Sequence, residues 1–402
     1  MHLKVLILGG GNGAHVHAGI AASNPDNEVR VLSLFQDEAE RWSKALESSD
    51  LVLDYTDVDG KEQQFVSKPG LITNDPKVAV PGSDIIVFVV PAFAHAQYWE
   101  ALKPHMEPGM VVIGMPGAAG WEFQAYDILG DKAKGITFFN FNSLPWTCRV
   151  TEFGKRADIV GFKEHFVGAI RKGRVEPKVD PLKAIQQSLG PLPVCAAYGD
   201  LLGMTLTYTN AFIHPSIMYG RWHDWDGKPV SESPLFYQGL DQTSADLLSS
   251  VSGEIVAIAK AICAKNADID LSNVKHISDI TLDFYADDIE DKSSFLRMMQ
   301  SNKAYEGLRH PVTNNEGGGV SPNFKFRYLC EDVPFGLVVH RGIAEIVGVP
   351  TPNIDKIITW GQGLIGKEFL VDGKITGKDI GMTRAPQRYG FTTLDAILGD
   401  HL

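Results

Sequence analysis

The sequence predicts an α/β protein in which an N-terminal doubly wound parallel sheet is followed by a mostly α-helical domain. Through the first half of the chain, short apolar runs alternate with helical segments, which is typical of a parallel sheet covered by helices. A glycine-rich turn at residues 9–14 follows the first of these runs. From about Gly199 onward the strand pattern gives way to helical periodicity.

Length and composition fit this organisation. The chain has 402 residues, of which 44% are hydrophobic and 21% charged, and this length exceeds the size at which one hydrophobic core usually divides. Glycine and proline interrupt the pattern at residues 189–194, shortly before the helical half begins. The predicted domains are therefore residues 1–198 and residues 199–402.

The charge and the cysteines narrow the class of function. A formal net charge of −12, without a Lys/Arg-rich block, disfavours binding to nucleic acid or to an anionic membrane surface. The four cysteines are scattered, which predicts reduced thiols in the cytoplasm and neither a disulfide framework nor a metal site. We expect a cytoplasmic protein whose partners are small molecules, without nucleic acid, membrane or metal.

Individual elements follow from hydrophobic periodicity. The apolar, β-branched runs predict buried strands, and the helical periodicity of the second half predicts its helices. The expected strands are residues 4–8, 28–34, 83–91, 111–114 and 136–140, and the expected helices of the second half are residues 201–219, 244–264, 272–285, 335–347 and 355–364.

The turn after the first strand reads Gly-Gly-Gly-Asn-Gly-Ala and opens a helix. Gly9 permits a tight turn, Gly11 lets the backbone approach a pyrophosphate, and Ala14 allows the helix to pack closely on the strand. The amides of the helix N-terminus then attract the phosphates. A lone motif of this kind is common, but here strand, turn, helix and returning strand stand in order. We predict a Rossmann-type dinucleotide site formed by Gly9, Gly11, Asn12, Gly13, Ala14 and, after the third strand, Pro91.

The choice between NAD and NADP depends on the end of the second strand. An acidic residue there would bind the ribose hydroxyls, and an arginine would bind a 2′-phosphate. The chain has Ser-Leu-Phe-Gln-Asp at residues 33–37, so the expected acid is displaced. Asp37 would repel a phosphate, whereas Arg41 would attract one. On balance the residues favour NAD(H).

Candidate residues for chemistry lie in two stretches of the second half. Asn210 and His214 are four residues apart on one face of a predicted helix, and a histidine is suited to proton transfer near neutral pH. Arg327 and Asp332 follow farther on: an arginine would hold a substrate carboxylate, and a carboxylate would orient a histidine. A buried structural histidine and a surface salt-bridge cluster would have the same composition, so both alternatives stay open at this point.

Several blocks, in order over essentially the whole chain, resemble the opine dehydrogenases of marine invertebrates. The blocks are GGGNGAH, VVPAFAH, SLPW, IHPSIMYGRW, PLFYQGLDQ, RYLCEDVPFG and PQRYGFTTLDAIL. The resemblance implies a cytoplasmic enzyme, usually a monomer, that condenses pyruvate with an amino acid and reduces the imine with NADH, regenerating NAD in anaerobic glycolysis. It also implies that His214 and Asp332 form the proton-transferring pair and that Arg327 grips a substrate carboxylate, with Asn210 as a further substrate-binding residue.

Two further substrate-binding positions bear on the amino acid. Members that use arginine need an acidic or aromatic pocket for its guanidinium, and the resemblance implies an acid where this chain has Asn142. The segment around Ile280 is also less aromatic than such a pocket requires. Because a neutral amide cannot offset a buried cation, we predict a small amine with an uncharged side chain: alanine, glycine, β-alanine or taurine. Arginine, as in octopine formation, is the alternative.

Two other classes of function remain in contention. A 2-hydroxy acid or glycerol-phosphate dehydrogenase on the same scaffold would oxidise NADH with a single substrate and no amine. A non-catalytic NADH-binding protein would bind the cofactor and be indifferent to replacement of His214. The presence of Arg327 and Asp332 argues against the second class, because a sensor needs no proton relay.

Overall fold

The computed structural model describes residues 2–399, and the chain folds into two compact units, residues 2–204 and 205–399. The sequence placed the boundary between residues 198 and 199, ahead of the observed one. The first unit extends further because Asp200, which caps the start of α7 (Leu201–Leu206), accepts two hydrogen bonds from Arg171 on a strand of the first unit.

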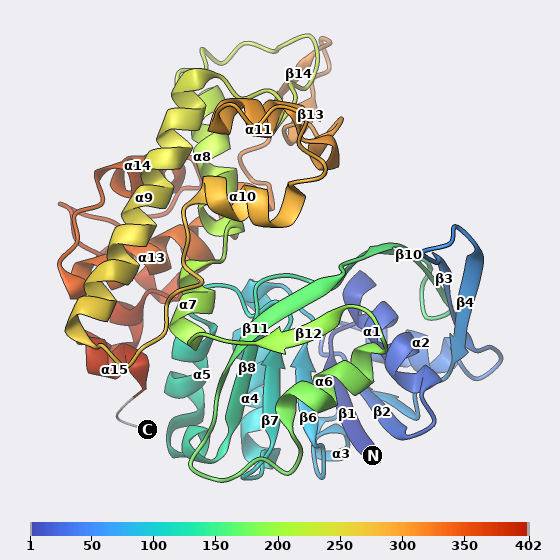
Figure 1. Ribbon diagram of the computed structural model, residues 1–402. Coiled ribbons are helices and arrows are strands. Elements are labelled where there is room, and N and C mark those ends of the chain that lie inside the picture. Colours follow the sequence, from blue (N-terminus) through green and yellow to red (C-terminus); the bar gives the residue numbers. More distant parts are fainter. Residues whose placement is uncertain (1, 400–402) are drawn as a thin grey trace. The chain divides into compact units, whose positions relative to one another are not determined.

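The first unit is built on an eight-stranded sheet with the order β12-β11-β8-β7-β6-β1-β2-β5 (Figure 1). All five predicted strands are present, as β1 (Leu3–Leu8), β2 (Asn27–Leu32), β6 (Ile85–Phe88), β7 (Val111–Gly114) and β8 (Thr137–Phe141). The sequence missed β5 (Leu71–Thr73), β11 (His165–Arg171) and β12 (Val194–Ala197). The sheet is parallel except where β11 pairs antiparallel with β8.

A second, four-stranded sheet with the order β4-β3-β10-β9 was not predicted. Its strands are β3 (Leu51–Thr56), β4 (Glu62–Ser67), β9 (Trp146–Glu152) and β10 (Arg156–Phe162). It packs against α1 (Asn12–Ser23), the helix that follows the glycine-rich turn. The remaining α-helices that lie wholly in this unit are α2 (Glu38–Ala45), α3 (Pro76–Ala79), α4 (His95–Leu102), α5 (Trp121–Leu129) and α6 (Pro181–Leu189), as Figure 1 shows.

The second unit is mostly helical, as predicted, with one short hairpin, β13 (Val312–Asn314) and β14 (Val320–Pro322). Two predicted helices are confirmed as α9 (Gln242–Lys265) and α14 (Pro352–Leu364). Helix α10 (Ile277–Tyr285) is shorter than predicted. Helix α13 (Val338–Val347) follows a single π-turn, η5 (Val333–Leu337). The prediction of one helix over residues 201–219 was wrong, because the chain breaks between α7 and α8 (Asn210–Trp222). The shorter helices are α11 (Phe295–Ser301), α12 (Arg327–Cys330) and α15 (Leu394–Leu398).

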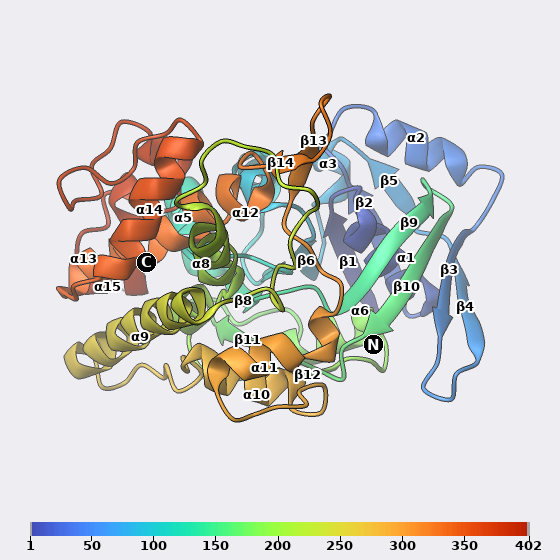
Figure 2. The same ribbon diagram turned by 90° about the horizontal axis from the view of Figure 1, so that it is seen from above.

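The core of the second unit lies between α8, α9, α13 and α14, whose arrangement Figure 2 shows. Helix α9 is long and apolar enough to cross a membrane by length and composition alone. Its residues Leu248, Val251, Ile255, Ile258 and Ile262 are buried. This spacing of three and four residues forms one apolar face, the pattern of a helix that packs on a protein core.

Candidate active site

The glycine-rich turn has room for a pyrophosphate. Gly9 has a φ of +116°, and a Cβ there would lie 2.7 Å from Cγ1 of Val90, so only glycine fits this turn. At Gly11 a Cβ would meet nothing within 4 Å. Gly11 immediately precedes α1, whose first turn carries no acidic residue. The helix N-terminus therefore offers backbone amides to open space, which is the environment that a phosphate requires.

The other predicted cofactor residues differ in their contacts with the rest of the first unit. A Cβ on Gly13 would lie 2.8 Å from Val89 and 3.2 Å from Leu144, and Ala14 is fully buried, so both allow close packing. The side-chain oxygen of Asn12 accepts a hydrogen bond of 2.9 Å from the backbone N–H of Val150 on β9. The backbone and the side-chain amide nitrogen of Asn12 are thus left for a nucleotide. Pro91 follows β6 and is exposed.

His15 fixes the same loop to the second sheet. Its Nδ1 donates to the carbonyl of Gly11 at 3.0 Å, and its Nε2 accepts from the backbone N–H of Gly154 at 3.0 Å. The ring stacks on Trp42 with 3.7 Å between centroids. Burial lowers the pKa of His15 to about 4, which keeps the ring neutral and able to accept this hydrogen bond.

The acid at the end of the second strand is Glu38, a residue that the sequence reasoning passed over. Asp37 and Arg41 form an exposed ion pair at 2.9 Å. The Glu38 carboxylate instead accepts a hydrogen bond of 2.7 Å from the hydroxyl of Ser33. It lies against the glycine-rich turn so closely that a Cβ on Gly10 would overlap it. The sequence offered a signal, because Glu38 lies one residue beyond residues 33–37, the segment in which the acid was expected.

In the second unit, His214 and Asp332 lie side by side. Nδ1 of His214, on α8, is 2.8 Å from Oδ2 of Asp332, and both residues are buried. Asp332 immediately precedes the π-turn η5, and a Cβ on Gly336 of that turn would lie 2.5 Å from Cβ of Ala211. Glycine at 336 therefore lets the segment carrying Asp332 pack directly on the helix that carries His214.

Aromatic residues surround the imidazole of His214. The hydroxyl of Tyr237 lies 3.0 Å from Nε2. Tyr328 stacks on the ring with 3.9 Å between centroids and 23° between planes. Tyr237 belongs to the block PLFYQGLDQ, which was noticed only as a resemblance, and its contact with His214 was not predicted. Its separation from His214 in the sequence gives no helix or strand spacing from which the contact could be derived.

Arg327 and Asn210 belong to the same part of the second unit. Nη2 of Arg327 is 3.0 Å from Oε2 of Glu331, and the Arg327 side chain is 57% exposed, so it is accessible to a ligand. Burial by itself lowers the pKa of Arg327, but the carboxylates of Glu331 and Asp332 outweigh it and raise the pKa. The Asn210 side chain hydrogen-bonds to Tyr208, a buried tyrosine. Burial raises the pKa of Tyr208, and the nearby charge of Asp332 raises it further.

The two residues predicted to select the amine lie on separate units. Asn142 follows β8 in the first unit, in the segment whose Leu144 packs on Gly13 of the nucleotide turn. Ile280 lies on α10 of the second unit and is half-buried. The expectation of a helix poor in aromatic residues is incomplete. Tyr285 of α10 contacts Tyr305, which in turn stacks on Tyr237.

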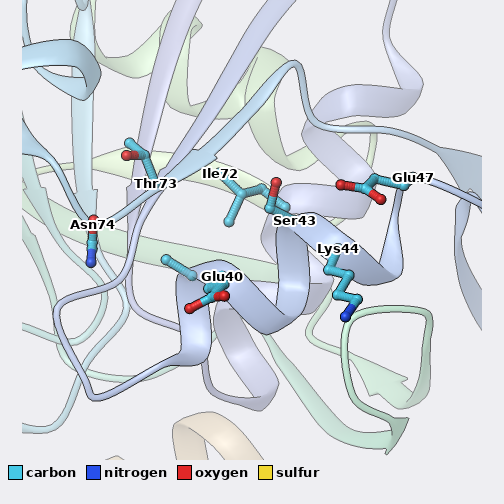
Figure 3. Close-up of a pocket in the computed structure, with 8 residues that line it drawn as sticks. Glu40, Ser43, Lys44, Glu47, Ile72, Thr73 and Asn74 are labelled. Carbon is cyan, nitrogen blue, oxygen red and sulfur yellow. The ribbon is translucent and has the colours of Figure 1, made fainter.

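A hollow of about 430 Å³ lies elsewhere on the first unit, between α2 and β5 (Figure 3). Its lining is Ala39, Glu40, Ser43, Lys44, Glu47, Ile72, Thr73 and Asn74. Most of these side chains are polar and exposed, and the lining includes none of the predicted site residues. We therefore place the candidate chemistry at the glycine-rich turn and at the His214–Asp332 pair.

Known proteins of one enzyme family are similar to this chain over almost its whole length. Residues 197–365 match the family model described as NAD/NADP octopine/nopaline dehydrogenase, alpha-helical domain. The chain is 55% identical to a tauropine dehydrogenase of Arabella iricolor over 98% of this chain and 99% of that protein. An octopine dehydrogenase structure with NADH and L-arginine superimposes with a TM-score of 0.96 at 47% identity, covering 99% and 98% of the two chains.

A second octopine dehydrogenase structure, with NADH and pyruvate, gives a TM-score of 0.93 at 46% identity, again over 99% and 98% of the chains. The cofactor that the glycine-rich turn accommodates is therefore NAD(H). The chain belongs to the opine dehydrogenase family, NAD-dependent oxidoreductases that act on a CH–NH bond and form opines by reductive condensation of a keto acid with an amino acid.

Proposed function

We propose that the amino substrate of this chain is a small amine without a cationic side chain, condensed with pyruvate. The observation that carries the proposal is the neutral Asn142, in the segment whose Leu144 packs on Gly13 of the nucleotide turn. A buried guanidinium needs a carboxylate or an equivalent charge to offset the loss of hydration, and an amide supplies none. The 55% identity to a tauropine dehydrogenase supports the same class of amine. Arginine, the ligand named for the octopine dehydrogenase structure, is the alternative.

The first unit holds the cofactor in this proposal. The backbone at Gly11 and the amides that open α1 bind the pyrophosphate, and the Glu38 carboxylate accepts hydrogen bonds from the ribose hydroxyls. Glu38 also repels a 2′-phosphate, which favours NADH over NADPH. When bound, NADH supplies the hydride that reduces the imine.

The second unit handles protons and the keto acid. Arg327 pairs with the carboxylate of pyruvate through its planar guanidinium. Attack of the amine on the keto carbon gives a carbinolamine, and loss of water from it requires a proton, for which His214 is the donor. Asp332 holds Nδ1 of His214 and stabilises the imidazolium, so that Nε2 is the nitrogen that exchanges protons. In the oxidative direction His214 is the base.

The test is NADH oxidation with pyruvate and a panel of amines: taurine, β-alanine, alanine, glycine and arginine, with a control that lacks amine. Oxidation that requires a neutral amine supports the proposal, and a preference for arginine overturns the assignment of the amine. Oxidation with pyruvate alone would indicate a 2-hydroxy acid dehydrogenase. In N142E we expect the ratio of kcat/KM for arginine to that for taurine to rise, because the new carboxylate offsets a guanidinium.

We also propose that the protein is a monomer in the cytoplasm. The supports are the resemblance to monomeric members and the scattered cysteines, which suit a reducing compartment. Light scattering on a size-exclusion column, over a range of protein concentrations, measures the mass directly. A mass near 88 kDa, about twice that of the 44.0 kDa chain, would contradict the monomer.

A further inference from the structure

The second ring nitrogen of His214 is occupied by a residue of the chain itself. Because Oδ2 of Asp332 accepts from Nδ1, Nδ1 carries the hydrogen and Nε2 of the neutral ring presents its lone pair. The Tyr237 hydroxyl, 3.0 Å away, is then the donor to Nε2. An imidazole nitrogen has one in-plane lone pair. A substrate that exchanges a proton with Nε2 must therefore either displace Tyr237 or reach His214 through it.

The ring of Tyr237 is held on several sides. It stacks on Tyr305 with 4.2 Å between centroids and 19° between planes, and it meets Phe236 edge-on at 4.9 Å. Tyr305 is itself packed against Tyr285 at 5.3 Å between centroids. Tyr328 covers a face of the His214 imidazole. Displacing Tyr237 would break this aromatic packing, so passage of the proton through the hydroxyl is the less costly route.

The ionisation of Tyr237 fits a group that passes protons without losing one. Burial, followed by the neighbouring Tyr328, Tyr285 and Asp332, raises its pKa above the ordinary value. A tyrosinate is therefore disfavoured. The Tyr237 hydroxyl therefore has to gain one proton as it gives up another, which is how a hydroxyl acts in a proton relay.

We propose that Tyr237 is a further catalytic residue, a proton relay between Nε2 of His214 and the reacting substrate. In the condensing direction the Tyr237 hydroxyl gives its proton to the leaving hydroxyl of the carbinolamine and takes the Nε2 proton of the His214 imidazolium. Water leaves, the protonated imine (iminium) forms with its N–H retained, and His214 becomes neutral. In the oxidative direction the protonated amine of the opine gives a proton to the Tyr237 oxygen as Nε2 accepts the tyrosine proton, which leaves the neutral amine. This assignment rests on the proposed roles of His214 and Asp332.

The test compares Y237F, which keeps the ring and its stacking, with Y305F, which removes the hydroxyl of the neighbouring stacked ring. We expect kcat of Y237F to fall about 10- to 100-fold, up to the lower end of the roughly 10²- to 10⁴-fold range for general acid–base catalysis. NADH binding, followed by quenching of protein fluorescence, should be unchanged. Y305F should stay within about twofold of the unsubstituted enzyme, since no proton passes through its hydroxyl.

The proton inventory in mixed H₂O and D₂O separates a relay from a structural role. Two protons moving together give a curved dependence of kcat on the deuterium fraction in the unsubstituted enzyme, and Y237F should give a straight line. If Y237F proves unstable, 3-fluorotyrosine at position 237 keeps the ring and lowers the pKa of its hydroxyl, and it should shift the pH profile of kcat.

Three results would overturn the relay: a kcat of Y237F within twofold of the unsubstituted enzyme, a faster Y237F, or proton inventories of equal curvature. A faster Y237F would make Tyr237 a cap that the substrate must displace. Failure of the proposed function looks different, because the unsubstituted enzyme would then show no amine-dependent oxidation of NADH with pyruvate.

Discussion

His214 and Asp332 lie 2.8 Å apart, nitrogen to oxygen, although 118 positions separate them in the chain. The contact depends on a glycine: Gly336, in the π-turn after Asp332, allows the backbone to meet Ala211 on the helix of His214. The pair is therefore a product of tertiary packing. We expect proton transfer by the pair to depend on the negative charge of Asp332 more than on the size of the side chain at position 332.

Replacement of Asp332 by asparagine should lower kcat about 10²- to 10⁴-fold, because the amide keeps the size of the side chain but neither fixes the Nδ1–H tautomer nor stabilises the imidazolium. NADH binding should not change, since the proposed nucleotide contacts lie in the first unit. Steady-state kinetics and fluorescence titration measure the two effects separately. D224N, an exposed carboxylate of the same unit, is the control. A D332N enzyme with more than a tenth of the original kcat would contradict the assignment.

Arg327 should be irreplaceable even by lysine. A single ammonium cannot make the two parallel hydrogen bonds of a guanidinium to a carboxylate, so R327K should raise KM for pyruvate by at least about tenfold. KM for the amine should change much less. R309K, at another exposed arginine of the second unit, provides the comparison. Equal increases in both KM values would show that Arg327 does not distinguish the keto acid.

Glu38 should decide the preference for NADH. In E38Q the amide still accepts from a ribose hydroxyl but no longer repels a 2′-phosphate, and the ratio of Kd for NADPH to Kd for NADH should fall about tenfold. D37N is the matched control, because Asp37 is already paired with Arg41 at the surface. Fluorescence titration with each nucleotide gives the Kd values. If D37N shifts the ratio and E38Q does not, the acid that selects the nucleotide is Asp37.

Buried histidines should make the protein sensitive to mild acid. Burial lowers the pKa of His17 from its ordinary value of 6.5 to about 3. Above pH 6.5 the ring is neutral in both folded and unfolded chains. Below it the unfolded chain binds a proton that the folded chain does not, so the free energy of unfolding falls as the pH falls, by about 1.4 kcal/mol per pH unit for this group.

H17Q isolates the contribution of His17. Glutamine can keep the hydrogen bond that Nε2 makes with the hydroxyl of Ser188, but it does not titrate. In urea unfolding from pH 7 to pH 5, the free energy of unfolding should fall less steeply in H17Q. The difference in slope should correspond to uptake of about one proton fewer on unfolding. H165Q, at an exposed histidine, should follow the unsubstituted protein. Parallel declines in all three proteins would mean that His17 is protonated without cost.

The parts of the fold predictable from sequence are those with a simple period. The parallel strands are apolar on both faces and stand out as unbroken runs. The second sheet escaped notice because its strands bury one face incompletely: β4, for example, is Glu-Gln-Gln-Phe-Val-Ser and buries only Ser67. Helices α7 and α8 looked like one helix because both are apolar, and the turn at residues 207–209 contains neither glycine nor proline.

Site residues divide in the same way. The glycine-rich turn could be predicted from the sequence because its backbone adopts a positive φ that favours glycine, as the φ of Gly9 confirms. Glu38 lies one residue past the segment where the acid was sought. Tyr237 comes from a segment without regular secondary structure, and no spacing rule connects such a segment with a distant helix. The His214–Asp332 pairing came from family resemblance and not from spacing.

The anchoring of the nucleotide turn by Asn12 and His15 has a consequence for the design of chimaeras. The partners of these side chains, Val150 and Gly154, lie far along the chain, on and just after β9. A graft that transferred only the first strand, turn and helix to another scaffold would carry the sequence motif without its supports. The segment that has to be transferred together with the turn is discontinuous in the sequence, and it ends with β10. Recombination points in this fold are therefore better placed after residue 162 than inside the segment between the turn and its anchors.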